Sequence, residues 1–182
     1  LKVTVVGLAR SGMAAARLLK ESGALVSLME KNSTPVLEKL AAQLKAEGIG
    51  VELGPHSRSF VEGRDFIVIS PGVHLDADPV KWAREAGIEV ISEIELAFSF
   101  CQAPVIAITG TNGKTTTTTL IGEVIKASGA KAHVLGNIGT PFSSAVLSIR
   151  KEDFVSLEVS SFQLEAIKDF KPKTKSIILK MY

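Results

Sequence analysis

One segment of this sequence has the residue types that chemistry on a phosphate group needs: it reads Gly110, Thr111, Asn112, Gly113, Lys114, Thr115 and Thr116. It follows the apolar run 105–108 and opens a helical pattern. Glycines let backbone N–H groups turn toward phosphate oxygens, a helix N-terminus adds positive potential, and the lysine neutralises phosphate charge. The Thr115 hydroxyl would hold Mg²⁺. We expect an ATP-binding loop here, with a glycine turn and a surface lysine as the plain alternative.

Two further side chains follow strands that should lie beside this loop. Glu158 ends the apolar run 154–157, where an ATPase-like domain places a Mg²⁺ ligand, although a satisfied buried acid would look the same. Asn137 follows the run 132–135 and is predicted to face the same crevice. The strict phosphate-loop pattern also requires a glycine five residues before Gly113, and this chain has Ile108 there.

A second glycine turn near the amino terminus follows strand 3–6 and comprises Gly7, Leu8, Ala9, Arg10, Ser11 and Gly12. This G-x-A-x-x-G spacing is a weakened dinucleotide fingerprint, and Glu30 stands where an acid meets a ribose hydroxyl. The turn Ser70, Pro71 and Gly72 ends strand 66–69, on the side where open α/β sheets bind ligands. These residues alone leave NAD, a UDP-sugar and plain turns all open.

Short β-branched runs alternate with helical patterns along most of the chain. Strands are predicted at 3–6, 25–29, 66–69, 89–91, 105–108, 132–135, 154–158 and 176–179. Helices are predicted at 13–21, around 37–44, at 93–100 and at 114–127. This alternation predicts an α/β fold with parallel sheets. Because one doubly wound sheet normally has a single phosphate loop, the two loops predict two domains, 1–98 and 99–182.

Composition restricts the classes of function. The 182 residues are 46% hydrophobic with a net charge of +2, which excludes a disordered chain and gives no reason to expect nucleic-acid binding. No apolar run approaches the roughly 20 residues of a membrane span. The single cysteine, Cys101, excludes an intrachain disulfide and favours a cytoplasmic protein. His56, His74 and His133 have no metal-ligand spacing, so all three are interpreted as structural.

Taken together, these motifs resemble the Mur ligase family of ATP-dependent amide-bond-forming enzymes. The resemblance rests on GTNGKT, GNIG, EVSSFQLE, VVGLARSGMAAARLL and SPGVHLDADPVKWAREAGIEVISEIELA. The last three are similar to the branch that adds D-glutamate to UDP-N-acetylmuramoyl-L-alanine in bacterial peptidoglycan precursor synthesis. The resemblance implies a Rossmann-like UDP-binding domain followed by a truncated P-loop-type ATPase α/β domain, and a monomeric parent.

The resemblance also implies roles for individual residues. ATP converts the substrate carboxylate to an acyl phosphate, which the amine of D-glutamate then attacks. Lys114 and the loop backbone would stabilise phosphoryl charge, Thr115 and Glu158 would hold Mg²⁺, and Asn137 would orient the substrate. The UDP end is assigned to the loop 7–12, to Glu30 and Lys31, and to the turn 70–72.

Two departures from the family pattern stand out. The family continues past strand 176–179 with Asn-x-Thr, whereas this chain reads Lys180-Met181-Tyr182, and a metal-binding lysine and a closing domain are missing. We therefore expect a fragment that binds the UDP ligand and is inactive by itself. Glu30 also replaces an aspartate that is frequent in the family. The alternatives are another family member, a nicotinamide-dependent oxidoreductase using the Gly7 loop, or a nucleotide-binding module only.

Overall fold

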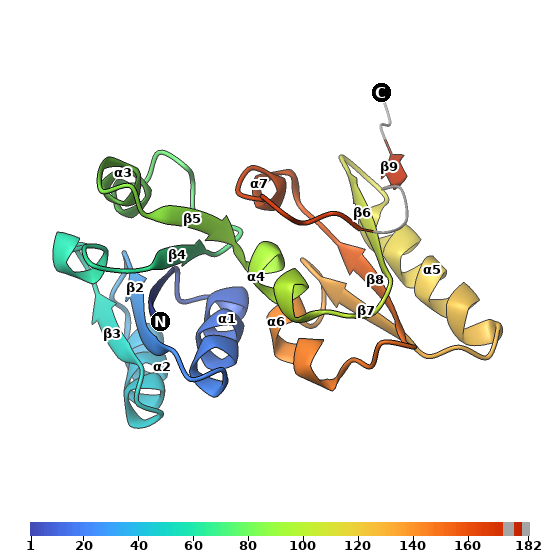
Figure 1. Ribbon diagram of the computed structural model, residues 1–182, viewed down its shortest axis with the longest axis horizontal. Helices are drawn as coiled ribbons and strands as arrows, with labels where there is room; N and C mark the ends of the chain where they lie inside the picture. The colour runs from blue at the N-terminus through green and yellow to red at the C-terminus, as the bar shows by residue number, and fades with distance from the viewer. Residues whose placement is uncertain (173–176, 180–182) are drawn as a thin grey trace. The chain divides into compact units, whose positions relative to one another are not determined.

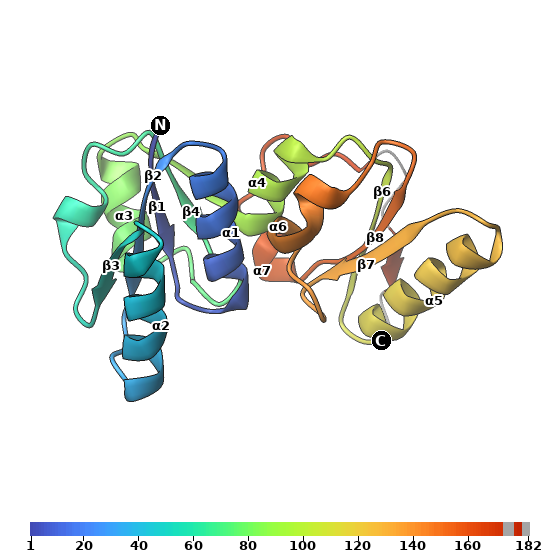
Figure 2. The ribbon, with the colours of Figure 1, turned by 90° about the horizontal axis from the view of Figure 1, so that it is seen from below.

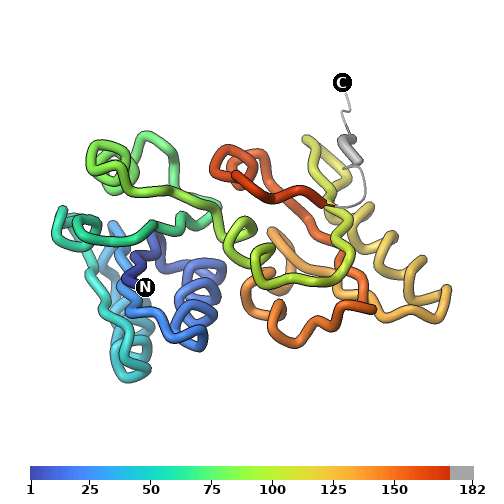
Figure 3. Tube along the Cα trace, in the orientation of Figure 1, coloured from blue at the N-terminus to red at the C-terminus, as the bar shows by residue number. Residues whose placement is uncertain are grey.

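The computed structural model describes residues 1–172 and 177–179, and the chain divides into two units, Leu1–Glu93 and Ile94–Tyr182. The trace completes the first unit before it enters the second at helix α4 (Glu93–Phe100) (Figure 3). Both units are α/β with parallel sheets, as the alternation of strands and helices predicted. Among the described residues, no helix has both the length and the apolar character needed to cross a membrane.

The first unit is a five-stranded parallel sheet in the order β3-β2-β1-β4-β5 (Figure 1). Its strands are β1 (Lys2–Val6), β2 (Leu25–Glu30), β3 (Gly50–Leu53), β4 (Phe66–Ile69) and β5 (Glu89–Ser92). The chain progresses in one direction from β1 to β3 and in the other from β1 through β4 to β5. The strand order therefore reverses between β1 and β4, which is where such sheets bind ligands.

Helices cover both faces of this sheet. They are α1 (Arg10–Glu21), α2 (Pro35–Ala46) and α3 (Asp78–Glu85), with a short 3₁₀ helix η1 (Arg58–Phe60) between β3 and β4. Helices α1 and α2 lie on one face and α3 on the other (Figure 1), as right-handed crossovers require. Strand residues such as Val3, Val5 and Ile67 are fully buried, which explains why these strands are nearly continuous apolar runs.

The second unit is a four-stranded parallel sheet in the order β7-β8-β6-β9. Its elements are β6 (Val105–Gly110), α5 (Lys114–Ala127), β7 (Ala132–Gly136), α6 (Phe142–Ala145), η2 (Val146–Ser148), β8 (Phe154–Glu158), α7 (Ser161–Leu164) and β9 (Ile177–Leu179). Helix α5 packs along β6, β7 and β8 (Figure 2). Thr118 is buried in this contact, and the hydroxyl of Ser156 on β8 donates to its carbonyl oxygen at 2.8 Å. The five consecutive threonines at 115–119 thus lie in the helix that was predicted at 114–127.

The units divide a few residues before the predicted boundary between residues 98 and 99, because α4 has strong contacts within the second unit. The buried carboxylate of Glu95 accepts hydrogen bonds from the backbone N–H groups of Lys168, Asp169 and Phe170 at 2.8, 2.9 and 3.0 Å. The rings of Phe98 and Phe170 meet edge to face with centroids 5.0 Å apart. Partners more than 70 residues away in sequence cannot be recognised from local pattern.

Most predicted elements are present with small shifts at their ends, and α1 begins at Arg10 rather than at Met13. Strand β3 and helices α3, α6 and α7 were not predicted. Strand β3 is short, begins with a glycine and contains the half-exposed Glu52, so it lacks the apolar run of a central strand. The predicted strand 176–179 is present as Ile177–Leu179, whereas Ser176 and residues 180–182 lie outside the described residues.

Candidate functional site

The predicted phosphate loop connects β6 directly to the N-terminus of α5 in the second unit. Gly113 has a φ of 74° and precedes the first helical residue, so it makes a left-handed turn that a side chain would oppose. The ammonium group of Lys114 bends back over the loop and donates hydrogen bonds to the carbonyl oxygens of Gly110 at 2.7 Å and Thr111 at 3.3 Å. The loop therefore presents a cation and a helix N-terminus at the same place, which is the chemistry of a phosphate site.

Glu158 and Asn137, which stand at the ends of neighbouring strands, meet Thr115 of the first turn of α5 beside this loop. The Thr115 hydroxyl donates to Oε2 of Glu158 at 2.7 Å, and Nδ2 of Asn137 lies 3.5 Å from Oε1. The backbone N–H of Asn137 also donates to the Glu158 carbonyl oxygen at 2.9 Å. Glu158 is 2% exposed. Both of its carboxylate oxygens are consequently oriented by neighbours at one edge of the sheet.

These groups fit a magnesium ion that is shared with a bound nucleotide. Within the described residues no group of three or more His, Cys, Asp or Glu side chains is positioned to hold a metal ion by itself. Thr115 and Glu158 nevertheless provide a hydroxyl and a carboxylate, the hard oxygen donors that Mg²⁺ prefers. Mg²⁺ is commonly bound by one or two such protein groups together with water and substrate phosphates. The remaining ligands would come from the nucleotide.

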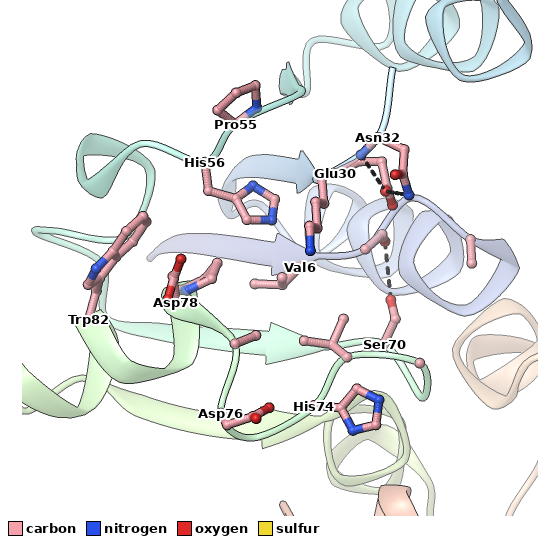
Figure 4. Close-up of a pocket in the computed structure, with 17 residues that line it drawn as sticks. Val6, Glu30, Asn32, Pro55, His56, Ser70, His74, Asp76, Asp78 and Trp82 are labelled. Atoms are coloured by element: carbon pink, nitrogen blue, oxygen red, sulfur yellow. Dashed lines mark hydrogen bonds between the residues drawn. The ribbon is translucent and has the colours of Figure 1, made fainter. Parts of the chain in front are cut away.

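A cavity of about 800 Å³ opens in the first unit at the carboxyl ends of β1, β2 and β4 (Figure 4). Its walls include the predicted residues Gly7, Ala9, Glu30, Lys31, Ser70 and Gly72. This is the edge at which the strand order reverses, and a cavity of this size suits a nucleotide-sized ligand. The two glycine-containing turns of the first unit therefore lie together at this edge, and their assignment to a UDP site stays a prediction.

The other predicted residues of these turns do not line the cavity: Leu8, Arg10, Ser11, Gly12 and Pro71. Leu8 is buried in the core. Gly12 acts by close approach, because a Cβ atom there would lie 1.9 Å from the Gly7 carbonyl oxygen and 2.6 Å from the Ser70 hydroxyl oxygen. That hydroxyl itself donates to the Gly7 carbonyl oxygen at 3.1 Å. These contacts hold the Gly7 turn in position, and this turn forms part of the cavity wall.

Glu30 has a structural task in addition to its position in the cavity. Its Oε2 accepts a hydrogen bond from the backbone N–H of Leu8 at 2.9 Å, and its Oε1 accepts from the backbone and side-chain nitrogens of Asn32 at 2.9 and 3.0 Å. The carboxylate thus ties the end of β2 to the loop after β1. A carboxylate can accept about four hydrogen bonds, so a ligand hydroxyl can still reach it.

Several cavity residues were missed by the sequence analysis. The histidines interpreted as structural, His56 and His74, both line the cavity, together with Val6, Asn32, Pro55, Val73, Asp76, Ala77, Asp78, Pro79 and Trp82. The histidines were judged only by metal-ligand spacing, and that criterion does not detect residues of a nucleotide site. The position of His74 just after the predicted strand 66–69 was a signal that could have found it, whereas β3, the strand before His56, was not itself predicted.

The third histidine belongs to a charged cluster in the second unit. Nε2 of His133 lies 2.8 Å from Oδ2 of Asp153, and the Lys131 ammonium lies 3.3 Å from the same oxygen. The hydrogen bond from His133, assisted by the Arg150 backbone N–H and by Lys131, lowers the pKa of Asp153 to about 2. This cluster ties the start of β7 to the start of β8, and the structural interpretation of His133 agrees with it.

Comparison with known families gives two adjoining matches. Residues 1–92 match the family described as Mur ligase MurD-like, N-terminal domain, and residues 108–177 match the one described as Mur ligase middle domain. The first match contains the cavity residues, and the second contains the phosphate loop, Asn137 and Glu158.

The similar proteins agree with these two family matches. The chain is 47% identical over 177 residues to a UDP-N-acetylmuramoylalanine--D-glutamate ligase of Thermoanaerobacter sp. (strain X514) and 48% identical to one of Geotalea uraniireducens (strain Rf4). Each alignment covers 97% of this chain and 39% of the relative, so the chain spans well under half of their length.

Among solved structures, a pseudomurein peptide ligase type C from Methanothermus fervidus matches 88% of this chain and 33% of that one, with 27% identity and a TM-score of 0.50. The match to a UDP-N-acetylmuramate-alanine ligase from Thermotoga maritima covers 87% of this chain and 37% of the ligase chain, with 22% identity and a TM-score of 0.53. At that identity the second match supports the fold alone.

Proposed function

Because the chain belongs to the Mur ligase family, we propose that it provides the UDP-substrate-binding and phosphate-binding units of an ATP-dependent ligase. The proposed reaction joins D-glutamate to UDP-N-acetylmuramoyl-L-alanine in peptidoglycan precursor synthesis. The names of the relatives with 47% and 48% identity support this choice of amino acid and substrate. We further propose a cytoplasmic, monomeric parent enzyme, consistent with substrates that are small and water-soluble.

The single observation that carries the proposal is the 2.7 Å hydrogen bond between Thr115 and Glu158 beside Lys114. Helix α5 supplies the hydroxyl and β8 supplies the carboxylate, so the pair exists only because the second unit folds as it does. A plain glycine turn needs neither group. The combination of loop, lysine, hydroxyl and buried carboxylate supports a site for a nucleotide with its Mg²⁺.

Each residue then has a defined task. Lys114, whose ammonium already lies over the loop, stabilises phosphate oxygens in place of the Gly110 and Thr111 carbonyl groups. Thr115 and Glu158 hold Mg²⁺ by their oxygen atoms, and Asn137, held by the Glu158 backbone, orients the substrate carboxylate. ATP with its Mg²⁺ supplies the phosphoryl group that activates this carboxylate for attack by an amine.

The first unit is proposed to bind the UDP end of the substrate. Backbone groups of the Gly7 and Ser70 turns and the N-terminus of the twelve-residue helix α1 favour a pyrophosphate. Glu30 and Lys31 then stand at the end of β2, where the ribose is expected. Binding of the UDP ligand therefore depends on the first unit, and activation of its carboxylate depends on the second.

The test is the substitution Lys114→Ala in the longest natural chain that contains this sequence. We expect D-glutamate-dependent phosphate release to fall by about 10² to 10³-fold, as for loss of one electrostatic partner, while affinity for UDP-N-acetylmuramoyl-L-alanine stays within about two-fold. Lys126→Ala is the matched control, because Lys126 is an exposed lysine of the same helix that pairs with Glu123. Loss of UDP-substrate affinity with turnover retained would reject the division of tasks.

A further inference from the structure

The cavity of the first unit extends past Glu30 to a group of residues that the proposed function does not use. His56 and Pro55 follow β3, and Pro79 and Trp82 belong to α3. In Figure 4 the His56 ring projects into the cavity. It lies on the Trp82 side of Glu30 and Val6. We propose that His56 selects the nucleobase of the ligand, by donating a hydrogen bond to a ring carbonyl and thus favouring uracil over cytosine. This inference rests on the proposed binding of a UDP ligand.

The strand order assigns the base to this end of the cavity. In sheets of this kind the phosphates bind at the loop after β1 and an acid after β2 binds the ribose. Here these positions are the Gly7 loop and Glu30. The next strand along the same edge is β3, which pairs with β2 from Ser27 to Glu30. A ligand that continues in the same direction therefore brings its base to the segment after β3, where His56 lies.

Charge and shape favour the same orientation. The carboxylate of Asp78 lines the Trp82 side of the cavity and would repel phosphate groups, whereas the α1 N-terminus attracts them at the other end. Pro55, Pro79 and Trp82 give the far end apolar walls. Flat apolar walls with few polar groups suit a base better than a diphosphate or a sugar.

The hydrogen bonding of His56 decides which base fits. Nδ1 is buried and has no hydrogen-bond partner among the described residues, and no contact of the described structure engages Nε2. A proton on Nδ1 would be buried without an acceptor, which costs free energy. A ring with its proton on Nε2 avoids that cost, and Nε2 is then the nitrogen that meets a ligand as a donor.

A donor at this place discriminates between the two pyrimidines. Uracil has a carbonyl oxygen at ring position 4, which accepts the Nε2–H bond. Cytosine has an amino group there, so two donors would face each other unless the histidine proton moved to the unpartnered Nδ1. A site built to hydrogen-bond one group rejects the analogue that leaves its polar atom unpaired. The same donor has no role in holding the phosphates.

The experiment is calorimetric titration of the full 182-residue chain with UDP and with CDP. We expect the unsubstituted chain to bind UDP at least about ten-fold more tightly than CDP. His56→Phe keeps a ring without a donor, and His56→Gln provides both a donor and an acceptor. Both should bring the ratio of the two dissociation constants to within about two-fold of one. His74→Phe is the matched control, since it removes another cavity histidine beside the Ser70 turn and should leave the ratio unchanged.

The outcomes separate this inference from the proposed function. If the unsubstituted chain binds UDP and both His56 variants keep the full preference over CDP, His56 does not read the base and the inference fails alone. If the folded, unsubstituted chain binds neither nucleotide, the proposed UDP site and the inference fail together. His56→Gln retains a polar side chain at the position, so it tests the inference even if His56→Phe does not fold.

Discussion

The hydroxyl of Thr115 donates a 2.7 Å hydrogen bond to Oε2 of Glu158, which joins the first turn of α5 to the end of β8. The two residues are 43 positions apart in sequence. Glu158 is almost completely buried, so this bond satisfies a carboxylate that water reaches poorly. In the ligand-free chain, the pair that is proposed to hold Mg²⁺ also stabilises the fold.

Replacing Thr115 by Val should therefore destabilise the second unit even without any ligand. Valine keeps the shape of threonine but leaves one oxygen of a buried carboxylate without its donor, at a cost of about 1 to 3 kcal/mol in the free energy of unfolding. Thr115→Ser retains the hydroxyl and should cost much less. Urea unfolding followed by far-ultraviolet circular dichroism measures both, and equal stabilities for the two variants would contradict the role given to this bond.

Gly12→Ala should weaken the proposed UDP site, although Gly12 does not line the cavity. The new Cβ atom would lie 1.9 Å from the Gly7 carbonyl oxygen, so the turn after β1 has to move. We expect a loss of about 1 to 3 kcal/mol in stability and weaker binding of UDP. Trp82 is the single tryptophan of the chain and lies in the first unit, so its fluorescence follows this unfolding.

Gly50→Ala serves as the control for that substitution. The nearest atom to a Cβ at Gly50 is the Ser27 hydroxyl oxygen at 3.4 Å, which is an ordinary contact. Its effect on the affinity for UDP should be negligible. An alanine at Gly12 that leaves both the Trp82 unfolding transition and the affinity unchanged would show that the turn is not held as described.

Much of this arrangement was accessible from sequence because it follows local pattern. The strand before each glycine turn and the helix after it placed Gly7 and Lys114 at the edge of a sheet. Parallel topology then brought Ser70 to the Gly7 turn in the first unit and Glu158 to Thr115 in the second. His56 was inaccessible in this way, since β3 is short and half-exposed and the residue owes its position to the pairing of β3 with β2. Glu95 was equally hidden, because its partners are backbone N–H groups distant in sequence.

Asp153→Asn should make the free energy of unfolding less dependent on pH in the acid range, between about pH 4 and pH 2. His133 and its neighbours lower the pKa of Asp153 from 3.8 to about 2, so the folded state favours the ionised carboxylate. That contribution is fully present above the unfolded pKa of about 3.9 and is lost as the pH falls through the folded pKa of about 2. The variant should be less stable than the unsubstituted chain at neutral pH.

The difference in stability between these two proteins should narrow as the pH falls from about 4 toward 2. Urea unfolding at a series of pH values measures it. Glu152→Gln is the control, since Glu152 is an exposed neighbouring acid. A difference that stays constant down to pH 2, or that grows there, is incompatible with the depressed pKa.

The 182-residue chain by itself should release no phosphate in response to D-glutamate. It spans 39% of the relatives' length, and an activated carboxylate needs an enclosed site to avoid reaction with water. A coupled phosphate assay with UDP-N-acetylmuramoyl-L-alanine, ATP, Mg²⁺ and D-glutamate checks this. Release that depends on D-glutamate and disappears in Lys114→Ala would show that these residues suffice for the reaction.

The cavity of the first unit is proposed to bind a UDP substrate and not a nicotinamide cofactor. Calorimetric titration of the chain with UDP-N-acetylmuramoyl-L-alanine and, separately, with NADH tests it most directly. We expect a saturable one-to-one isotherm for the UDP ligand, weaker binding of that ligand in Gly12→Ala, and no measurable heat for NADH. Tighter binding of NADH than of the UDP ligand would contradict it.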